Sequence, residues 1–496
     1  MVGIRKIAED LRDRFRWGVS RAVSRFRTDT DIVLVMCPGW GVSLPPLGIS
    51  YLSGLLKHRG FRVRCLDLNL ELYKVFPEKI YWELNHPEFF INDRLFDKNI
   101  RPFLDGHIDR WAREILRSDP RAVGFSLFMS TTRVSFLLAR RLRQLRPETV
   151  LIGGGPEVTR IKRVMGDGIK DFVRLDREGI LGGVFDVFVE GEGEETLSEI
   201  LPSIRSGRDH SRARGVLYAR EGRLVVNPAR PLMPDLDILP PPDFHDFNLD
   251  AYAWRMLPLS TSRGCINRCT FCADSPLWAK YRNRSAPKVL KEMRYLAEEY
   301  ARDEFEITDS LFNGDMAQLE RLCDSLINAR MNVRWSAKVA IRREMTADLM
   351  KKMKAAGCVS LGYGVESGSP AVLKDMRKNP DTGLSARVIR DTWTAGIQVD
   401  CFFLIGYPTE TEADFQMTLD FIRENAAHIH RFSQVTGCHI EDDSHLGLNL
   451  EKYRISFKED GWHSAQSTPE IRQDRLSRFR EFARGLHEHY QCEVQS

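Results

Sequence analysis

Three cysteines within eight residues carry the strongest chemical signal in this sequence. Cys265, Cys269 and Cys272 have the spacing C-x3-C-x2-C, whereas the other seven cysteines are scattered singly. Iron–sulfur clusters are held by thiolates, usually four, so three close cysteines would leave one iron open to a substrate or cofactor. A structural zinc site prefers four protein ligands, and no fourth Cys or His stands at an obvious spacing. We therefore predict an iron–sulfur cluster with an open iron, and keep zinc and chance as alternatives.

The elements around these cysteines form a repeating pattern of strands and helices. The predicted strands cover 257–262, 304–309, 333–339, 359–365, 399–406 and 432–438. The predicted helices between them cover 286–301, 315–330, 344–356, 384–395 and 411–426. Six such repeats predict a partial (β/α)6 TIM-type barrel over 257–440. The cysteines follow its first strand, at the end of the barrel where active sites lie.

The first half of the chain shows a second α/β pattern. Short apolar runs alternate with helical segments over 29–201, which predicts a doubly wound parallel sheet of the Rossmann-like kind. Glycine-rich loops follow its strands, and such sheets bind ligands at those ends. We read 70–112 as an insertion, 202–256 as a proline-rich linker with a small hairpin, and 441–496 as a C-terminal helical segment.

Charge balance and targeting segments indicate which partners and which cellular location to expect. Residues 1–28 predict a basic amphipathic helix, which we expect to pack on its own domain, with attachment to a membrane surface as the alternative. The 73 basic residues nearly balance 69 acidic ones, unlike the concentrated basic face of a nucleic-acid-binding protein. No run reaches the roughly 18 apolar residues of a spanning helix, and no signal peptide is evident. We expect a cytoplasmic protein, with a peripheral membrane location as the alternative.

The segment RGCINRCTFC, at 263–272, resembles the cysteine signature of the radical S-adenosylmethionine (SAM) superfamily. The resemblance implies a [4Fe–4S] cluster on the three cysteines, with SAM bound to the open iron. In that family one electron from the cluster cleaves SAM to methionine and a 5′-deoxyadenosyl radical. Phe271 stands where the family has an aromatic residue beside the adenine.

Later segments match the order of motifs in that superfamily, over about residues 257–427. FEITD (305–309) resembles the second-strand motif near the SAM amino group, GYGVES (362–367) the G-x-E-S motif, and FLIGYPTET (403–411) the adenine-flanking segment. Either Ser336 or Lys338 is expected to reach the SAM carboxylate. The resemblance thus implies as SAM-binding residues Phe271, Asp309, Ser336, Lys338, Gly362, Gly364, Glu366, Ser367, Ile405 and Gly406.

Residues 30–200 resemble the cobalamin-binding domain that many radical SAM enzymes carry. The matching segments are PPLGISYL (45–52), GGGP (153–156) and EGEGE (190–194). The resemblance implies as cobalamin-binding residues Pro45, Pro46, Leu47, Gly48, Ser126, Ser130, Thr131, Gly153, Gly154, Gly155, Glu190 and Gly191. The D-x-H-x-x-G motif of other B12 proteins is absent after the first strand. His107 has only its start, and a lone histidine is more often a surface or packing residue.

The expected activity follows from these two resemblances. We expect a radical SAM enzyme, with [4Fe–4S], SAM and cobalamin as cofactors, that methylates an unactivated carbon. One alternative is radical cyclisation, oxidation or rearrangement without methyl transfer, and another is a non-catalytic iron–sulfur or electron-transfer protein. The expected partners are a small-molecule or lipid-like substrate and an electron donor such as flavodoxin or ferredoxin, and no nucleic acid.

Overall fold

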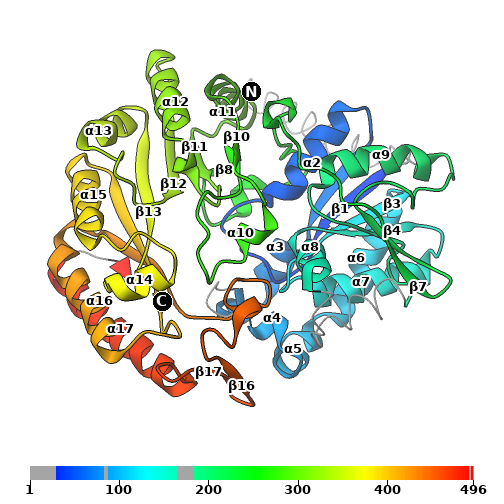
Figure 1. Ribbon diagram of the computed structural model, residues 1–496. Coiled ribbons are helices and arrows are strands. Elements are labelled where there is room, and N and C mark those ends of the chain that lie inside the picture. Colours follow the sequence, from blue (N-terminus) through cyan, green and yellow to red (C-terminus); the bar gives the residue numbers. More distant parts are fainter. Residues whose placement is uncertain (1–29, 83–87, 165–181, 491–492, 495–496) are drawn as a thin grey trace, which may run out of the picture.

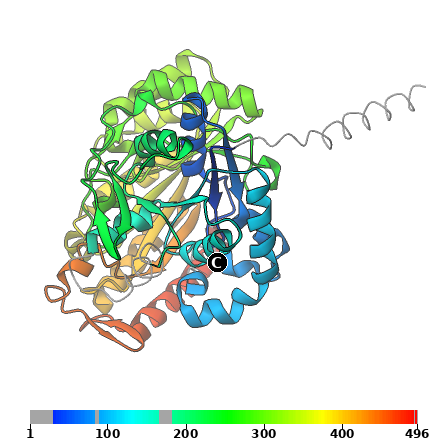
Figure 2. The same ribbon diagram turned by 90° about the vertical axis from the view of Figure 1, so that its right-hand side faces the viewer.

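Two mainly parallel sheets with helices packed on them make up the core of the computed structural model of the protein (Figure 1). It describes residues 30–82, 88–164, 182–490 and 493–494. The predicted helix over 1–28 lies outside the described residues. In Figure 1 the two halves lie side by side, and after a turn of 90° one lies behind the other (Figure 2). Within the described part of the chain, no helix has the length and apolar character needed to cross a membrane.

The first sheet has the strand order β2-β1-β3-β4-β5-β6-β7. Its strands are β1 Ile32–Met36, β2 Val63–Asp67, β3 Ala122–Ser126, β4 Val150–Gly154, β5 Val187–Val189, β6 Val216–Arg220 and β7 Arg223–Val226. The first five pair in parallel. β1 is IVLVM and is buried throughout, as expected for a strand covered on both faces. Its covering helices are α2 Leu47–His58, α7 Thr132–Leu145, α8 Pro156–Val164 and α9 Gly193–Arg205.

The segment read as an insertion is largely helical. It contains α3 Leu68–Val75, α4 Glu88–Ile91, α5 Asp93–Asn99 and α6 Asp105–Arg117. Its aromatic side chains Trp82, Phe90, Phe96 and Trp111 are buried against the same apolar cluster as β1 and β3. The insertion is therefore part of the core of this half.

The segment read as a linker contributes to the first sheet. α9 runs to Arg205, past the predicted boundary at 201, and β6 pairs antiparallel with β5. The predicted hairpin thus extends the sheet, because an edge strand leaves backbone groups that a hairpin can pair. Beyond β7, residues 227–256 contain only two single-turn helices.

The second sheet has the order β18-β15-β14-β13-β12-β11-β8, with every neighbouring pair parallel. Its strands are β8 Leu257–Leu259, β11 Glu304–Ile307, β12 Arg334–Val339, β13 Cys358–Glu366, β14 Gln398–Ile405, β15 Arg431–Gly437 and β18 Glu493–Val494. Its helices are α11 Ala286–Tyr300, α12 Met316–Asn328, α13 Ala347–Ala355, α14 Pro370–Asp375, α15 Thr382–Thr394, α16 Glu412–Asn425 and α17 Pro469–Tyr490. The sequence did not predict β18, a two-residue strand without a distinctive pattern.

One apolar core runs through both halves. Ile49 of α2 and Val187 of β5 belong to the same buried cluster as Leu257 of β8 and Val289 of α11. The carboxyl ends of the strands in each sheet carry the loops that hold most of the predicted site residues.

Candidate functional site

The three cysteines lie on a loop that is closed at its base. Two short strands, β9 Ser262–Arg263 and β10 Arg282–Asn283, pair antiparallel on either side of it. Gly264 has φ +88°, and a Cβ there would lie 2.6 Å from the backbone oxygen of Lys280. Glycine is therefore required where the loop leaves its base.

The thiols of this loop are partly exposed, and none forms a disulfide. Burial raises the pKa of the Cys265 and Cys269 thiols, and Cys265 interacts electrostatically with the other two cysteines. No three or more His, Cys, Asp or Glu side chains of the described residues converge as they would around a single metal ion. Zinc needs four ligands about 2.0–2.3 Å from one point. Three thiolates on one loop can each bind a different iron of a multi-iron cluster.

A lysine that the sequence reasoning missed lies beside these cysteines. The side chain of Lys378 is 17% exposed and its Nζ lies 2.9 Å from Oε1 of Glu366. It also donates a hydrogen bond of 2.5 Å to the Gly364 backbone oxygen. Burial acts to lower the pKa of Lys378, but Glu366 and Cys269 raise it further, so the ammonium stays charged. Lys378 lies 12 residues after Glu366 in no recognisable motif, and no sequence signal marked it.

The end of β13 is shaped to bring this pair together. Glu366 has φ +69°, an uncommon conformation for a residue with a side chain. A Cβ at Gly364 would lie 2.6 Å from the Glu366 carboxylate and 3.0 Å from Nζ of Lys378. Strained backbone of this kind persists where the surroundings hold it, often at functional sites.

Asp309 holds the segment that leads into the cysteine loop. Its buried carboxylate accepts hydrogen bonds from Ser260, from Ser262 and from both the amide and the hydroxyl of Thr261. Burial raises the pKa of Asp309, while these hydrogen bonds lower it. Its oxygens are therefore engaged by the protein itself.

The predicted residues on β12 and β13 lie along one face of the second sheet. Ser336 donates a hydrogen bond to Glu306, and Lys338 is exposed with its Nζ 5.8 Å from the centre of the Phe402 ring. The Phe402 ring lies over Gly362, where a Cβ would meet it at 2.5 Å. Lys338 thus retains solvent access, whereas Ser336 is bonded to a neighbouring carboxylate.

Ser367 and Ile405 are buried. Ser367 lies 3.2 Å from the Thr418 hydroxyl and accepts a hydrogen bond from the amide of Ser369, so it is bonded within its own loop. Phe271 is partly buried and packs on the apolar cluster that contains Tyr407 and Cys438. Ser367 and Ile405 are thus enclosed by the fold, whereas Phe271 lies on the cysteine loop and keeps part of its surface accessible.

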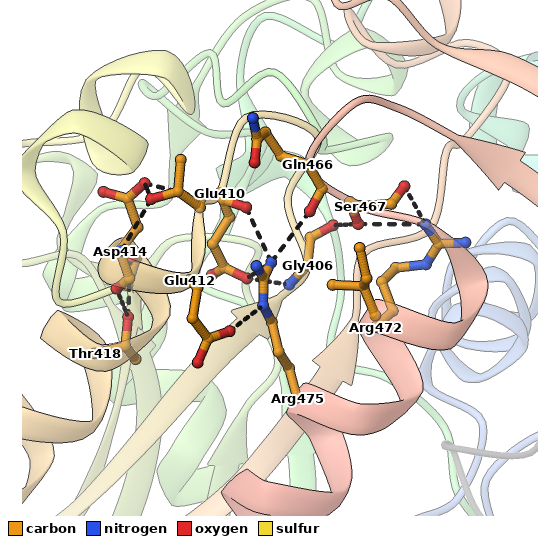
Figure 3. A network of polar contacts seen from close by, with 12 residues as sticks. Gly406, Glu410, Glu412, Asp414, Thr418, Gln466, Ser467, Arg472 and Arg475 are labelled. Carbon is orange, nitrogen blue, oxygen red and sulfur yellow. Dashed lines mark hydrogen bonds and ion pairs between the residues drawn. The ribbon is translucent and has the colours of Figure 1, made fainter.

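The loop after β14 is held by the C-terminal helix. Gly406 has φ +75°, and its amide donates to Oε2 of Glu410 at 2.7 Å. Arg475 of α17 points into this loop and donates to the backbone oxygen of Glu410 at 2.9 Å and to its carboxylate at 3.2 Å (Figure 3). The Glu410 and Arg475 side chains are 0% and 4% exposed. Burial raises the pKa of Glu410 to about 7.

Loops meet at the carboxyl edge of the first sheet. Gly39 has φ +108°, and a Cβ there would lie 2.5 Å from the backbone oxygen of Ser130. Gly155 has the same φ, and a Cβ there would lie 2.8 Å from the backbone oxygen of Leu127. Trp40 stacks on Phe128 with ring centroids 3.9 Å apart and is 36% exposed. The loops of this edge therefore pass close to one another, and Trp40 gives the edge an exposed aromatic surface.

The other predicted residues of this edge differ in accessibility. Thr131 is fully buried, and its hydroxyl accepts from the amide of Phe128 and donates to backbone oxygens, so it holds its own loop. Pro45, Pro46 and Gly153 are buried, Leu47, Ser126, Ser130, Gly154 and Glu190 are half-buried, and Gly48 and Gly191 are exposed. His107 lies on α6 in the insertion, where its Nδ1 is 2.7 Å from Arg110. It does not lie on a loop at the sheet edge.

The two carboxyl edges are joined by ion pairs. Arg160 of α8 lies 3.4 Å from Asp442, which follows β15. Arg263, at the base of the cysteine loop, pairs with Glu192 and Glu194 of the EGEGE segment. The predicted ligand loops of one half thus contact the cysteine loop of the other.

Residues 259–422 match the model of the radical SAM superfamily. An uncharacterized methyltransferase of Pyrococcus horikoshii is 26% identical over 317 residues, which are 63% of this chain and 66% of the relative. Cytidylyl-2-hydroxyethylphosphonate methyltransferase of Streptomyces wedmorensis is 26% identical over 423 residues, which are 76% and 73% of the two chains. The fold resembles that of the radical SAM methyltransferase TsrM of Kitasatospora setae, solved with cobalamin and a [4Fe–4S] cluster bound. The TM-score is 0.64 and the sequence identity 18%, and the match covers 85% of this chain and 78% of TsrM.

Proposed function

We propose that this chain, a radical SAM enzyme by its matching domain, uses cobalamin to transfer a methyl group to an unactivated carbon of a small molecule. The observation that carries the proposal is the juxtaposition of the cysteine loop with the ligand edge of the first sheet, through Arg263 and Glu192. The methyltransferase relatives and the cobalamin-bound TsrM structure support the same reaction.

The proposed division of the chain follows the two sheets. We assign a Rossmann-type cobalamin-binding domain to residues 30–226 and a partial TIM-type barrel to residues 257–440, with 441–496 closing the barrel. The first range is longer than the sequence suggested, because β6 and β7 complete its sheet. The two separate seven-stranded sheets support this division.

Cys265, Cys269 and Cys272 would hold the cluster, which supplies the electron that cleaves SAM, while cobalamin carries the methyl group. Lys378 is well suited to meet the SAM carboxylate, because a buried ammonium bonds strongly to an anion. Glu366 would orient that ammonium through their 2.9 Å contact. Asp309 would position the cysteine loop rather than touch SAM, since its oxygens are already bonded to Ser260, Thr261 and Ser262.

At the first sheet, Gly39 and Gly155 would shape the cofactor edge by letting their loops pass close to the backbone of Ser130 and Leu127. Trp40 and Phe128 would give cobalamin an apolar surface to lie on. The predicted cobalamin contacts that remain accessible, and that we propose, are Leu47, Gly48, Ser126, Ser130, Gly154, Glu190 and Gly191. Thr131 instead supports the loop from within.

The substrate class and the electron source complete the proposal. We propose a small-molecule substrate, in keeping with the phosphonate named for one relative, a cytoplasmic location and a flavodoxin or ferredoxin as electron donor. Binding to a membrane surface, and the lipid-like substrate that went with it, depended on residues 1–28. That idea stays a prediction.

The test is anaerobic reconstitution with iron and sulfide, followed by reduction and assay of SAM cleavage. The wild type is expected to form 5′-deoxyadenosine, and the triple variant Cys265→Ala, Cys269→Ala, Cys272→Ala is expected to form none. With hydroxocobalamin and substrate, SAM labelled in its methyl group should label the product and yield one S-adenosylhomocysteine per 5′-deoxyadenosine. An unlabelled product would favour cyclisation, oxidation or rearrangement. A reconstituted cluster that never cleaves SAM would favour the electron-transfer alternative.

A further inference from the structure

Two glutamates of the first half neutralise two arginines at the base of the cysteine loop. Arg263 donates through Nη1 to Glu192 at 2.7 Å and through Nη2 to Glu194. Arg282, opposite Arg263 in the β9–β10 ladder, lies 3.0 Å from the same Glu192. The four side chains, the charge quartet, are 6–13% exposed. Two positive and two negative groups leave the quartet without net charge.

The quartet lies close to the thiols along the chain. Arg263 is two residues before Cys265, and its guanidinium carbon lies 5.8 Å from the ring centre of Trp278, on the far side of the same loop. The glutamates begin α9 in the first half, directly after β5. The position of the cysteine loop relative to the first sheet is therefore fixed by charges that the first sheet supplies.

Burial makes this arrangement electrostatically strong. Burial alone would lower the pKa of Arg263, and Glu194 and Glu192 raise it above its ordinary value. The Arg282 and Arg263 partners likewise hold the pKa of Glu192 below its usual range, against the effect of burial. Arg263 and Glu192 thus remain charged, and removing one member of the quartet leaves an uncompensated charge in a poorly solvated place.

We propose that Glu192 and Glu194 are positioning residues that also set the electrostatic field at the cluster, so that the first half controls how readily the cluster is reduced. This inference rests on the proposed function, because it needs a cluster on the three cysteines. It goes beyond that function by giving the EGEGE segment a role toward the cluster in addition to one toward cobalamin.

The proposal predicts potential shifts of opposite sign. Glu194→Gln leaves the quartet with one positive charge, which stabilises the more negative reduced cluster and raises its midpoint potential. Arg263→Met leaves one negative charge and lowers the potential. Damage to the loop alone would not produce opposite shifts from two variants of the same contact.

The experiment is a potentiometric titration of the reconstituted full-length protein, followed by the electron paramagnetic resonance signal of the reduced cluster. The proteins compared are the wild type, Glu194→Gln, Arg263→Met, the charge-preserving Arg263→Lys, and Tyr51→Phe as a control. Tyr51 also joins the two halves, through a 2.6 Å hydrogen bond to Glu292, and its loss changes no charge. Arg263→Lys and Tyr51→Phe should keep the wild-type potential.

The potential shifts test the electrostatic proposal, and cluster uptake tests the proposed function. Opposite shifts in Glu194→Gln and Arg263→Met support the proposal, while equal, same-sign or absent shifts overturn it. If Glu194→Gln does not fold, Glu192→Gln provides the same test, since it also removes one negative charge from the quartet. If the wild type takes up no cluster, the proposed function fails, and that result is distinct from a loaded cluster with an insensitive potential.

Discussion

Lys378 is the residue whose removal tests the proposed SAM site most directly. Lys378→Met is expected to weaken SAM binding by roughly 10–100-fold, because a hydrogen bond to a charged group contributes about 1.5–3 kcal/mol. Lys378→Arg should recover part of the affinity. The measurement is the Kd of SAM for the cluster-loaded protein, by calorimetry without reductant.

The matched control for this prediction is Lys374→Met. Lys374 is exposed on α14, four residues away, so its loss changes the net charge equally without touching the Glu366 pair. If both variants bind SAM as the wild type does, Lys378 contributes nothing to SAM affinity. Its role would then be confined to holding the end of β13.

The raised pKa of Glu410 predicts that the stability of the folded protein depends on pH. Its pKa is raised from 4.5 to about 7 by burial, so the folded protein binds a proton more tightly than the unfolded chain. Its contribution to stability is complete below pH 4.5 and is lost as the pH rises to about 7. At 1.36 kcal/mol per pKa unit this amounts to about 3 kcal/mol.

Glu410→Gln should remove this dependence. The free energy of unfolding of the wild type minus that of the variant is expected to fall steadily between pH 4.5 and 7, and to level off above. Urea titrations at several pH values measure it. A difference that rises with pH over this window would mean that Glu410 is ionised in the folded protein and stabilised by Arg475.

At the scale of elements, α17 supports the loop between β14 and α16. Arg475 contacts the Glu410 backbone and carboxylate together with the backbone oxygen of Gln466 (Figure 3). Arg475→Met should therefore loosen residues 403–411, speed amide exchange there and weaken SAM binding. Hydrogen–deuterium exchange of peptides from this loop measures the effect.

Arg478 provides the control on the same helix. It is 39% exposed and pairs at 2.5 Å with Glu412, which is 59% exposed, so the pair contributes at most about 1 kcal/mol. Arg478→Met should leave exchange in 403–411 unchanged. If amide exchange in residues 403–411 is equally slow in Arg475→Met and Arg478→Met, then α17 covers the barrel without holding this loop.

The whole molecule shows where sequence reasoning succeeds and where it ends. The cysteine spacing and five helices of the second half follow from local spacing and periodicity; α11, for instance, begins at Ala286 as expected. The six-residue α14 was not predicted, because it is too short to show a helical period. Lys378 and the charge quartet could not be predicted, because their partners are distant in sequence and no motif records the pairing. The hairpin at 216–226 was expected, but its pairing with β5 depends on which edge of the sheet is open.

A buried ion pair where the two halves meet is expected to make the molecule unfold as one unit. Arg284 and Glu292 form a bidentate pair at 2.7 and 2.6 Å with side chains 2% and 0% exposed, and Tyr51 of α2 donates to the same carboxylate. Arg284→Met leaves the carboxylate buried without its cation, which costs about 3–5 kcal/mol. Because the pair lies where the halves meet, calorimetry should then resolve two unfolding transitions in place of one.

The double variant Arg284→Met, Glu292→Met separates charge from packing. Replacing a whole buried ion pair by apolar side chains is often close to neutral, so most of the lost stability should return. Arg302→Met breaks a pair with Asp250, which is 85% exposed, and should cost less than about 1 kcal/mol. If the double variant is as unstable as Arg284→Met, the loss comes from packing around Arg284, and the ion pair is not what makes the two halves unfold together.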